Sequence, residues 1–351
     1  MKTVFTVLFV FISQIIVAQH VPLYVGSYTN TESEGIYYYS FNTNTGTLSN
    51  KKLAVKAENP SFITFSANKD FLYAVSESDK ESTVASYAVT ENGTLNLLNK
   101  VSSNGSGPCH IQLNQSSTKA VVSNYGGGTV SIYNLQKNGS FINAFQVVNN
   151  NIPGVPAHAH SGKFYNNELF VADLGRNFLS QYVEKDNTYV LKKNYMMAKK
   201  AGPRHFEISK NGSFIYVINE LNSTITALKR VEDTYTEIQT ISTLKDGFIG
   251  MNACADIHLS NNQQFLYGSN RGENTIVVYK RNLETGLLSK IQSIFVEGDW
   301  PRNFTLSPNG KFLLVANQRS NNISVYNVQK ETGKLTFMYS EACVSPVCLL
   351  F

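Results

Sequence analysis

The chain repeats one pattern six times, at intervals of about 45 to 50 residues. In each copy a proline or a cysteine opens a hydrophobic segment, a polar turn follows, and further hydrophobic segments come after it. The copies begin at Pro60, Pro108, Pro156, Pro203, Cys254 and Pro301, and a partial seventh copy begins at Pro346. A repeat of this length with several short strands is typical of a β-propeller, in which each copy is one blade and neighbouring blades bury each other's faces.

Each complete copy contains four candidate strands. Tight polar turns such as Asn211-Gly212 and Asn309-Gly310 separate the first two, and a weaker fourth strand follows, as at 93–98 and 333–338. Tyr, Phe, Val, Ile and Thr are abundant and long helical periodicity is missing, which predicts an all-β protein. Because no linker or low-complexity segment interrupts the repeat, we expect residues 19–351 to form a single domain.

The chain before Pro60 supplies only three of the four strands of a blade, at 23–28, 35–41 and 46–53. The segment at 346–351 would supply the missing inner strand of that first blade. Closure of this kind leaves no open edge between the first and the last blade. We therefore predict a seven-bladed β-propeller whose first blade is closed by the C-terminal strand.

Residues 1–18 have the pattern of a secretory signal peptide. Lys2 is followed by an apolar stretch from Val4 to Val17, and the small residue Ala18 precedes Gln19. Cleavage after about residue 18 predicts an exported protein, periplasmic or secreted, with no membrane attachment afterwards. The alternative is a buried first strand or an uncleaved anchor, and a misread signal would mean a cytoplasmic protein.

Charge and cysteine content restrict the kinds of ligand and metal that we expect the protein to bind. The net charge of +5 is scattered along the chain, which gives weak support for an anionic ligand and none for nucleic acid. Cys109, Cys254, Cys343 and Cys348 have no metal-ligand spacing, and nothing in the sequence argues for a metal or another cofactor. Export permits a disulfide, but buried free thiols are favoured because free cysteine behaves as a small hydrophobe. We expect a monomer.

Strand direction predicts where a site would lie. If the first strand of a blade leaves one face, the second returns to it, so the opening of the first strand and the loop after the second strand share that face. A ring of arginines with a histidine pair and one lone glutamate there offers acid, base and anion-stabilising groups for a carboxylate, phosphate or lactone. The candidates on this face are His158, His160, Asp173, Arg204, His205, Glu220, Arg271, Arg302, Asn317 and Gln318.

Several of these residues also have a structural interpretation. Asp173, in the string ADLG, could cap a turn, and asparagine recurs at one loop position in three copies, at Asn124, Asn270 and Asn317, as turn-forming residues do. The arginines and histidines could equally bond to a neighbouring blade. Glu220 breaks the asparagine pattern, which favours a functional role.

The motifs resemble a known family over essentially the whole chain after residue 18. The strings that carry the resemblance include YVGSYTN, GPCHI, HAH, VADLGRN, GPRHFEIS, YVINELNSTIT, LYGSNRG, WPRNFTLSP and SPVCLLF. They are similar to the seven-bladed lactonases of the 6-phosphogluconolactonase type, a family that also includes a fungal carboxy-muconate lactonising enzyme. The resemblance implies hydrolysis of a small-molecule lactone, 6-phospho-glucono-1,5-lactone in the type enzyme.

The same resemblance implies site residues. The catalytic groups of the family fall on His158 or His160, Arg204, Glu220 and Arg271. From the ring described above, His205, Asp173, Arg302, Asn317 and Gln318 are the expected substrate-binding residues. One position departs from the family pattern: the loop usually written DLG-x-D ends in Asn177, which puts a carboxylate role there in doubt.

Two other functions remain open. The same residues could close or open a lactone by proton transfer, as a cycloisomerase does. An exported propeller could also bind a glycan or a protein without catalysis, since propellers serve many unrelated functions. The predicted signal peptide conflicts with a cytosolic phosphorylated substrate and favours an unphosphorylated sugar lactone.

Overall fold

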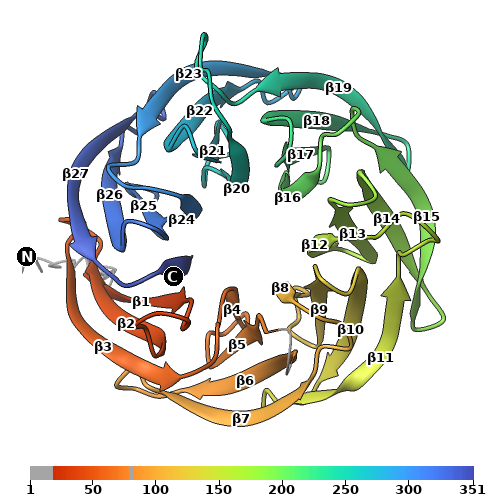
Figure 1. The fold of residues 1–351 in the computed structure, drawn as a ribbon, viewed down its shortest axis with the longest axis horizontal. Helices are drawn as coiled ribbons and strands as arrows, with labels where there is room; N and C mark the ends of the chain where they lie inside the picture. The colour runs from red at the N-terminus through yellow and green to blue at the C-terminus, as the bar shows by residue number, and fades with distance from the viewer. Residues whose placement is uncertain (1–18, 79–81) are drawn as a thin grey trace, which may run out of the picture.

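The computed structural model describes residues 19–78 and 82–351, and the predicted signal peptide at 1–18 lies outside them. Within these ranges, 28 strands form seven four-stranded antiparallel sheets arranged around a central axis (Figure 1). The predicted seven-bladed propeller is therefore confirmed. Over the same residues the structure has no helix long and apolar enough to cross a membrane.

Each blade contributes one strand to each of four concentric layers. The inner strands are β28 (Pro346–Leu350), β4 (Ile63–Phe65), β8 (Pro108–Leu113), β12 (Ala159–Tyr165), β16 (Pro203–Ile208), β20 (Ala253–Leu259) and β24 (Pro301–Leu306). The second strands are β1 (His20–Ser27), β5 (Phe71–Ser76), β9 (Lys119–Asn124), β13 (Glu168–Asp173), β17 (Phe214–Asn219), β21 (Phe265–Arg271) and β25 (Phe312–Asn317).

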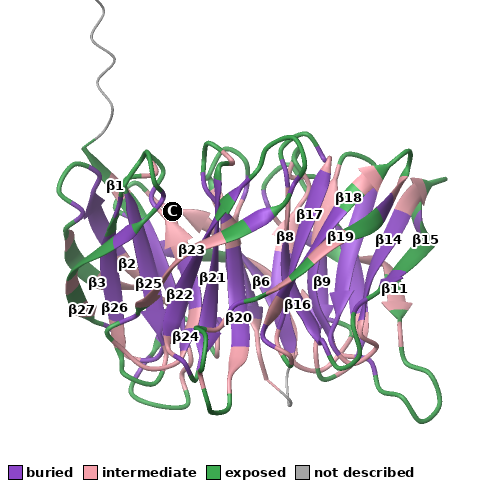
Figure 2. Cartoon of the chain, turned by 90° about the horizontal axis from the view of Figure 1, so that it is seen from above, coloured by how far each residue is buried: buried purple, intermediate pink, exposed green. Residues whose placement is uncertain are grey.

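The outer half of each blade is more exposed, as Figure 2 shows by the green and pink of the outer strands. The third strands are β2 (Gly35–Asn42), β6 (Thr83–Val89), β10 (Thr129–Leu135), β14 (Phe178–Lys185), β18 (Thr224–Val231), β22 (Thr275–Arg281) and β26 (Asn322–Val328). The outer strands are β3 (Leu48–Lys56), β7 (Leu95–Ser102), β11 (Phe141–Asn149), β15 (Thr188–Met196), β19 (Thr234–Ser242), β23 (Leu288–Phe295) and β27 (Leu335–Ala342).

The two ends of the chain close the ring together. β28 pairs with β1 in the sheet order β28-β1-β2-β3, with Leu349 opposite Val25. Leu349 also packs in the core between the first and the last blade, and its backbone N–H donates to Asn303 Oδ1 of β24 at 2.7 Å. The closure predicted from the sequence is thus confirmed, and it joins the first blade to the last.

Apolar side chains fill the space between neighbouring blades. One core cluster combines Tyr216 of β17 with Leu266 of β21 and Tyr279 of β22. At the rim, the turn glycine before an outer strand lies against an aromatic ring of the adjacent blade: a Cβ at Gly333 would come within 2.3 Å of Phe265 Cγ. Gly333 has a φ of +68°, so glycine is required there by both the backbone and the contact.

A belt of polar side chains ties four consecutive inner strands together around the axis. Lys163 of β12 pairs with Glu207 of β16 at 2.8 Å, and Glu207 also lies 3.4 Å from His258 Nδ1 of β20. His258 Nε2 is 3.0 Å from Asp256 Oδ2, which accepts a 2.5 Å hydrogen bond from Asn303 of β24. Burial alone would lower the pKa of His258, but the two carboxylates outweigh it and raise that pKa to about 10.

The raised pKa of His258 predicts a pH dependence of stability. The folded protein holds a proton there that the unfolded chain releases above about pH 6.5, so the contribution is complete below that pH and is lost as pH rises towards about 10. We expect the difference in unfolding free energy between the wild type and His258→Gln to shrink from pH 7 to pH 10. Denaturant titrations at several pH values measure it, with His20→Gln as control. A difference that stays constant across this range would contradict the assignment.

Removal of residues 346–351 tests the closure. The truncation exposes the edge of β1 and takes Val347, Cys348 and Leu349 out of the core, where each is at most 4% exposed. Burial of such side chains contributes roughly 1.5–3 kcal/mol each, a large part of the stability of a typical domain. We expect the truncated chain to melt at least about 10 °C lower or to aggregate, measured by circular dichroism. Phe351→Ala, which leaves β28 intact, should stay folded, and a wild-type melting curve for the truncated chain would refute the role of β28.

Candidate active site

A repeated β-bulge brings consecutive side chains of the inner strands to the axis. In β16, Pro203 is opposite Asn219 and His205 is opposite Ile218, so Arg204 is an extra residue in the ladder. The same one-residue shift occurs in β8, β12, β20, β24 and β28. A bulge redirects side chains that would otherwise alternate, and Arg204 and His205 accordingly line the same axial cavity.

A second ring comes from the ends of the second strands. In four blades an asparagine there is fully buried: Asn124, Asn219, Asn270 and Asn317. Asn219, for example, donates to the hydroxyls of Thr224 and Thr226 at 2.9 and 3.0 Å. Glu220 therefore follows the asparagine of its blade, which corrects the interpretation that it breaks the asparagine pattern. The buried asparagine fixes the turn and delivers the next side chain to the mouth of the channel. The residues at this position around the ring are Tyr28, Glu77, Tyr125, Leu174, Glu220, Arg271 and Gln318.

Glu220 is held between two arginines. Its Oε2 lies 2.9 Å from Arg204 Nε and 2.9 Å from Arg271 Nη2. The two arginine side chains are 3% and 5% exposed, whereas that of Glu220 is 19% exposed. Among the residues that the structure describes, both ion pairs of the Glu220 side chain are made by Oε2, and Oε1 has no partner. The three residues predicted from three separate segments thus meet, with one carboxylate oxygen facing the channel mouth.

Backbone carbonyls of β20 orient both guanidinium groups. Arg204 Nη1 donates to Ala255 O, and Arg271 donates through Nε to Ala253 O at 3.1 Å and through Nη2 to Cys254 O at 2.9 Å. Within the described chain, Arg204 Nη2 and Arg271 Nη1 have no acceptor. Burial lowers the pKa of Arg204, and it lowers that of Arg271 to about 10. Each arginine therefore keeps one N–H group for a ligand.

His205 lies behind Arg204 and is fixed by Asp256. Its Nδ1 is 2.7 Å from Asp256 Oδ1, so Nδ1 carries the proton and Nε2 faces Arg204 Nη1 at 3.4 Å as an acceptor. Burial and the nearby Arg204 lower the pKa of His205 to about 4. His205 is therefore neutral and supports the guanidinium of Arg204; sequence reasoning did not assign Asp256 this role.

The two predicted catalytic histidines surround Tyr125 rather than Glu220. The His158 ring stacks on that of Tyr125 with centroids 4.5 Å apart, and its Nδ1 lies 2.9 Å from Tyr125 O. The His160 ring is edge-on to Tyr125 at 5.4 Å, and burial lowers its pKa well below the ordinary value. Tyr125 was missed in the sequence, although it occupies the loop position that Glu220 has in its own blade.

Three loop residues have structural roles, which corrects two predictions of substrate binding. Asp173 is fully buried and accepts from the backbone N–H groups of His158 and Arg176 at 2.9 and 3.0 Å. Asn317 is fully buried and donates to Val296 O and Ser324 Oγ. Asn177, at the position that departs from the family pattern, accepts from Gly202 N at 2.9 Å and so anchors the segment leading to β16.

Arg302 lines the same small axial cavity as Arg204 and belongs to a second polar cluster. Arg302 Nη2 is 3.6 Å from Glu77 Oε2, and the guanidinium lies 5.2 Å from the centre of the Tyr28 ring. The Tyr28 hydroxyl donates to Glu77 Oε2 at 2.8 Å. Gln318, also predicted to bind substrate, has a buried Oε1 with no partner among the described residues.

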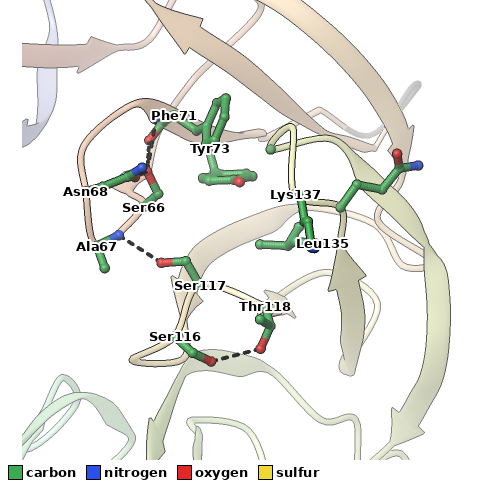
Figure 3. Close-up of a pocket in the computed structure, with 12 residues that line it drawn as sticks. Ser66, Ala67, Asn68, Phe71, Tyr73, Ser116, Ser117, Thr118, Leu135 and Lys137 are labelled. Carbon is green, nitrogen blue, oxygen red and sulfur yellow. Dashed lines mark hydrogen bonds between the residues drawn. The ribbon is translucent and has the colours of Figure 1, made fainter.

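The recesses that are larger than the axial cavity lie on the face opposite the channel mouth. One of about 380 Å³ is formed between two blades by the turns after β4, β8 and β10 (Figure 3). Recesses of about 250 and 580 Å³ occur at equivalent places between other blades, so they follow from blade packing. The axial cavity beside Arg204 and Arg302 is far smaller, about 10 Å³. In the described part of the chain no group of three His, Cys, Asp or Glu residues is placed to hold a metal ion. All four cysteines are buried free thiols, as favoured from the sequence.

Comparison with known proteins shows which family the chain is similar to. A family model described as "Lactonase, 7-bladed beta-propeller" matches residues 22–351. A Bacillus subtilis protein named 6-phosphogluconolactonase is 32% identical over 291 residues, which cover 80% of this chain and 83% of that protein.

Solved structures are similar over almost the whole chain. A putative 6-phosphogluconolactonase from Bacteroides fragilis has a TM-score of 0.87 at 30% identity, covering 95% of this chain and 98% of the other. A periplasmic gluconolactonase from Pseudomonas aeruginosa has a TM-score of 0.88 at 27% identity, covering 93% and 98%. The chain belongs to the family of seven-bladed β-propeller lactonases.

Proposed function

We propose that the protein hydrolyses a sugar lactone at Glu220, Arg204 and Arg271. One observation carries the proposal: both arginines lie 2.9 Å from the same oxygen of Glu220, which leaves Oε1 and one N–H group of each arginine without a partner among the described residues. A base beside two preorganised cationic donors is the arrangement that ester hydrolysis requires. The family names of the relatives support the same reaction class.

In the proposed reaction, Glu220 Oε1 accepts a proton from a water molecule that attacks the lactone carbonyl carbon. The negative charge that develops on the carbonyl oxygen is stabilised by Arg204 Nη2 and Arg271 Nη1, and a single donor of this kind is worth about 3 to 4 kcal/mol in other hydrolases. The carbonyl–ring oxygen bond then breaks and the ring oxygen takes a proton. His158, on the Tyr125 side of the mouth, is the candidate donor for that proton, because burial holds the pKa of His160 well below its ordinary value and keeps it neutral.

The cycloisomerase alternative uses the same groups and is separated from hydrolysis by its product. The non-catalytic alternative is less favoured because a binding surface does not need a carboxylate flanked by two buried arginines. A lactone panel on the protein without residues 1–18, with products analysed by mass spectrometry, decides among them. Hydrolysis adds one water to the lactone, isomerisation leaves the mass unchanged but changes the structure, and a binder leaves the lactone as it was.

Glu220→Gln tests the base. The glutamine side chain has the same shape as glutamate and its oxygen can still accept a hydrogen bond from an arginine, so the fold should persist. Turnover should fall about tenfold or more, as expected for loss of a general base. Initial rates on glucono-1,5-lactone, corrected for spontaneous hydrolysis, measure the effect. Glu297→Gln makes the same atomic change at an exposed site on the same face and should keep wild-type turnover. Equal turnover in Glu220→Gln and the wild type would remove Glu220 from the mechanism.

We also propose that the protein is exported and acts on an exported lactone. The support is the signal-like pattern of residues 1–18 and the periplasmic gluconolactonase among the similar structures. The mature protein is expected to begin at about Gln19, which mass spectrometry of the native protein determines. An intact Met1 in a cytosolic fraction would exclude export.

A further inference from the structure

The charges at the channel mouth do not balance. Arg204 and Arg271 are buried cations and Arg302 is a partly buried one, and Glu220 and Glu77 are the two carboxylates paired with these three. The belt below them is neutral, because Lys163 and His258 are matched by Glu207 and Asp256. One positive charge is therefore left for a ligand. An uncharged lactone develops one negative charge as its carbonyl is attacked, and so fits this excess.

Arg302 is the cation whose hydrogen-bonding capacity is least used. Among the described residues its guanidinium has only the 3.6 Å contact to Glu77 and the stacking on the Tyr28 ring. Its side chain is 17% exposed and lines the axial cavity with Arg204. A partly exposed guanidinium with so few contacts has N–H groups available to a ligand in the mouth.

Glu77 places an acceptor beside these donors. Its Oε2 is occupied by the Tyr28 hydroxyl at 2.8 Å and by Arg302, whereas Oε1 has no partner within the described residues. A sugar hydroxyl both donates and accepts, so it can bind Glu77 Oε1 and an Arg302 N–H together. A phosphate group has only acceptors at neutral pH and carries a charge of about −1.5 to −2, so the Glu77 carboxylate repels it.

We propose that Glu77 and Arg302, held by Tyr28, form a hydroxyl-binding subsite that selects an uncharged, polyhydroxylated lactone over its phosphorylated form. This inference rests on the proposed lactone hydrolysis and adds its substrate class. Glu77 acts as the specificity determinant, since it neutralises the arginine that a phosphate would otherwise pair with.

Glu77→Gln tests the subsite. Glutamine keeps the acceptor for Tyr28 but removes the charge, so we expect kcat/KM for the 6-phosphate of glucono-1,5-lactone, relative to the unphosphorylated lactone, to rise about tenfold or more. The wild type should prefer the unphosphorylated lactone. Asp246→Asn removes one negative charge from an exposed position on the same face and should leave the ratio unchanged.

A binding measurement separates this inference from the proposed function. Calorimetry with gluconate and 6-phosphogluconate, the two hydrolysis products, measures the preference between unphosphorylated and phosphorylated ligands without turnover. Glu77→Gln should strengthen 6-phosphogluconate binding about tenfold. If the wild type hydrolyses neither lactone, the proposed reaction fails while calorimetry still tests the subsite. A selectivity that Glu77→Gln does not change, or a wild-type preference for the phosphorylated compounds, would overturn the subsite.

Discussion

Closure of the ring by β28 is the constraint on which the rest of the structure depends. A propeller blade buries its faces only against two neighbours, and the first and last blades have two neighbours only when the ring is complete. The pairing of β28 with β1 and the hydrogen bond from Leu349 to Asn303 complete it. Once the ring is closed, every inner strand begins at the same rim, and side chains from distant parts of the sequence meet there.

The bulge at the start of the inner strands turns this scaffold into a site. In a regular strand alternate residues face opposite sides, so only one of each consecutive pair would face the axis. The extra residue lets Arg204 and His205 share the axial cavity, as do Arg302 and Asn303. One layer of residues therefore supplies the groups at the mouth, and the next layer supplies their supports, such as His205 on Asp256.

The blades share one framework and differ at the residue that follows the second strand. Buried asparagines recur because they hold the loop, whereas the following residue varies from Tyr125 to Glu220 to Gln318. The variation divides the mouth into two halves: a Glu220 half with two arginines, and a Glu77 half with Arg302 and Tyr28. The first half has the groups for attack on a carbonyl, and the second has the groups for recognition of hydroxyls.

The sequence by itself determined the number of blades, the closure by the C-terminal strand and the meeting of Arg204, Glu220 and Arg271, because the repeat fixes strand direction and strand direction fixes which ends share a face. It did not determine which polar residues at that face are free to act. Asp173 and Asn317 were expected to bind substrate, but their polar atoms are engaged in loop hydrogen bonds, whereas Tyr125, Asp256 and Glu77 were given no role. Only the tertiary structure decided these roles, since they depend on contacts between blades: Glu77 and Tyr28 meet Arg302 from three different sheets, and no local pattern in the chain encodes that meeting.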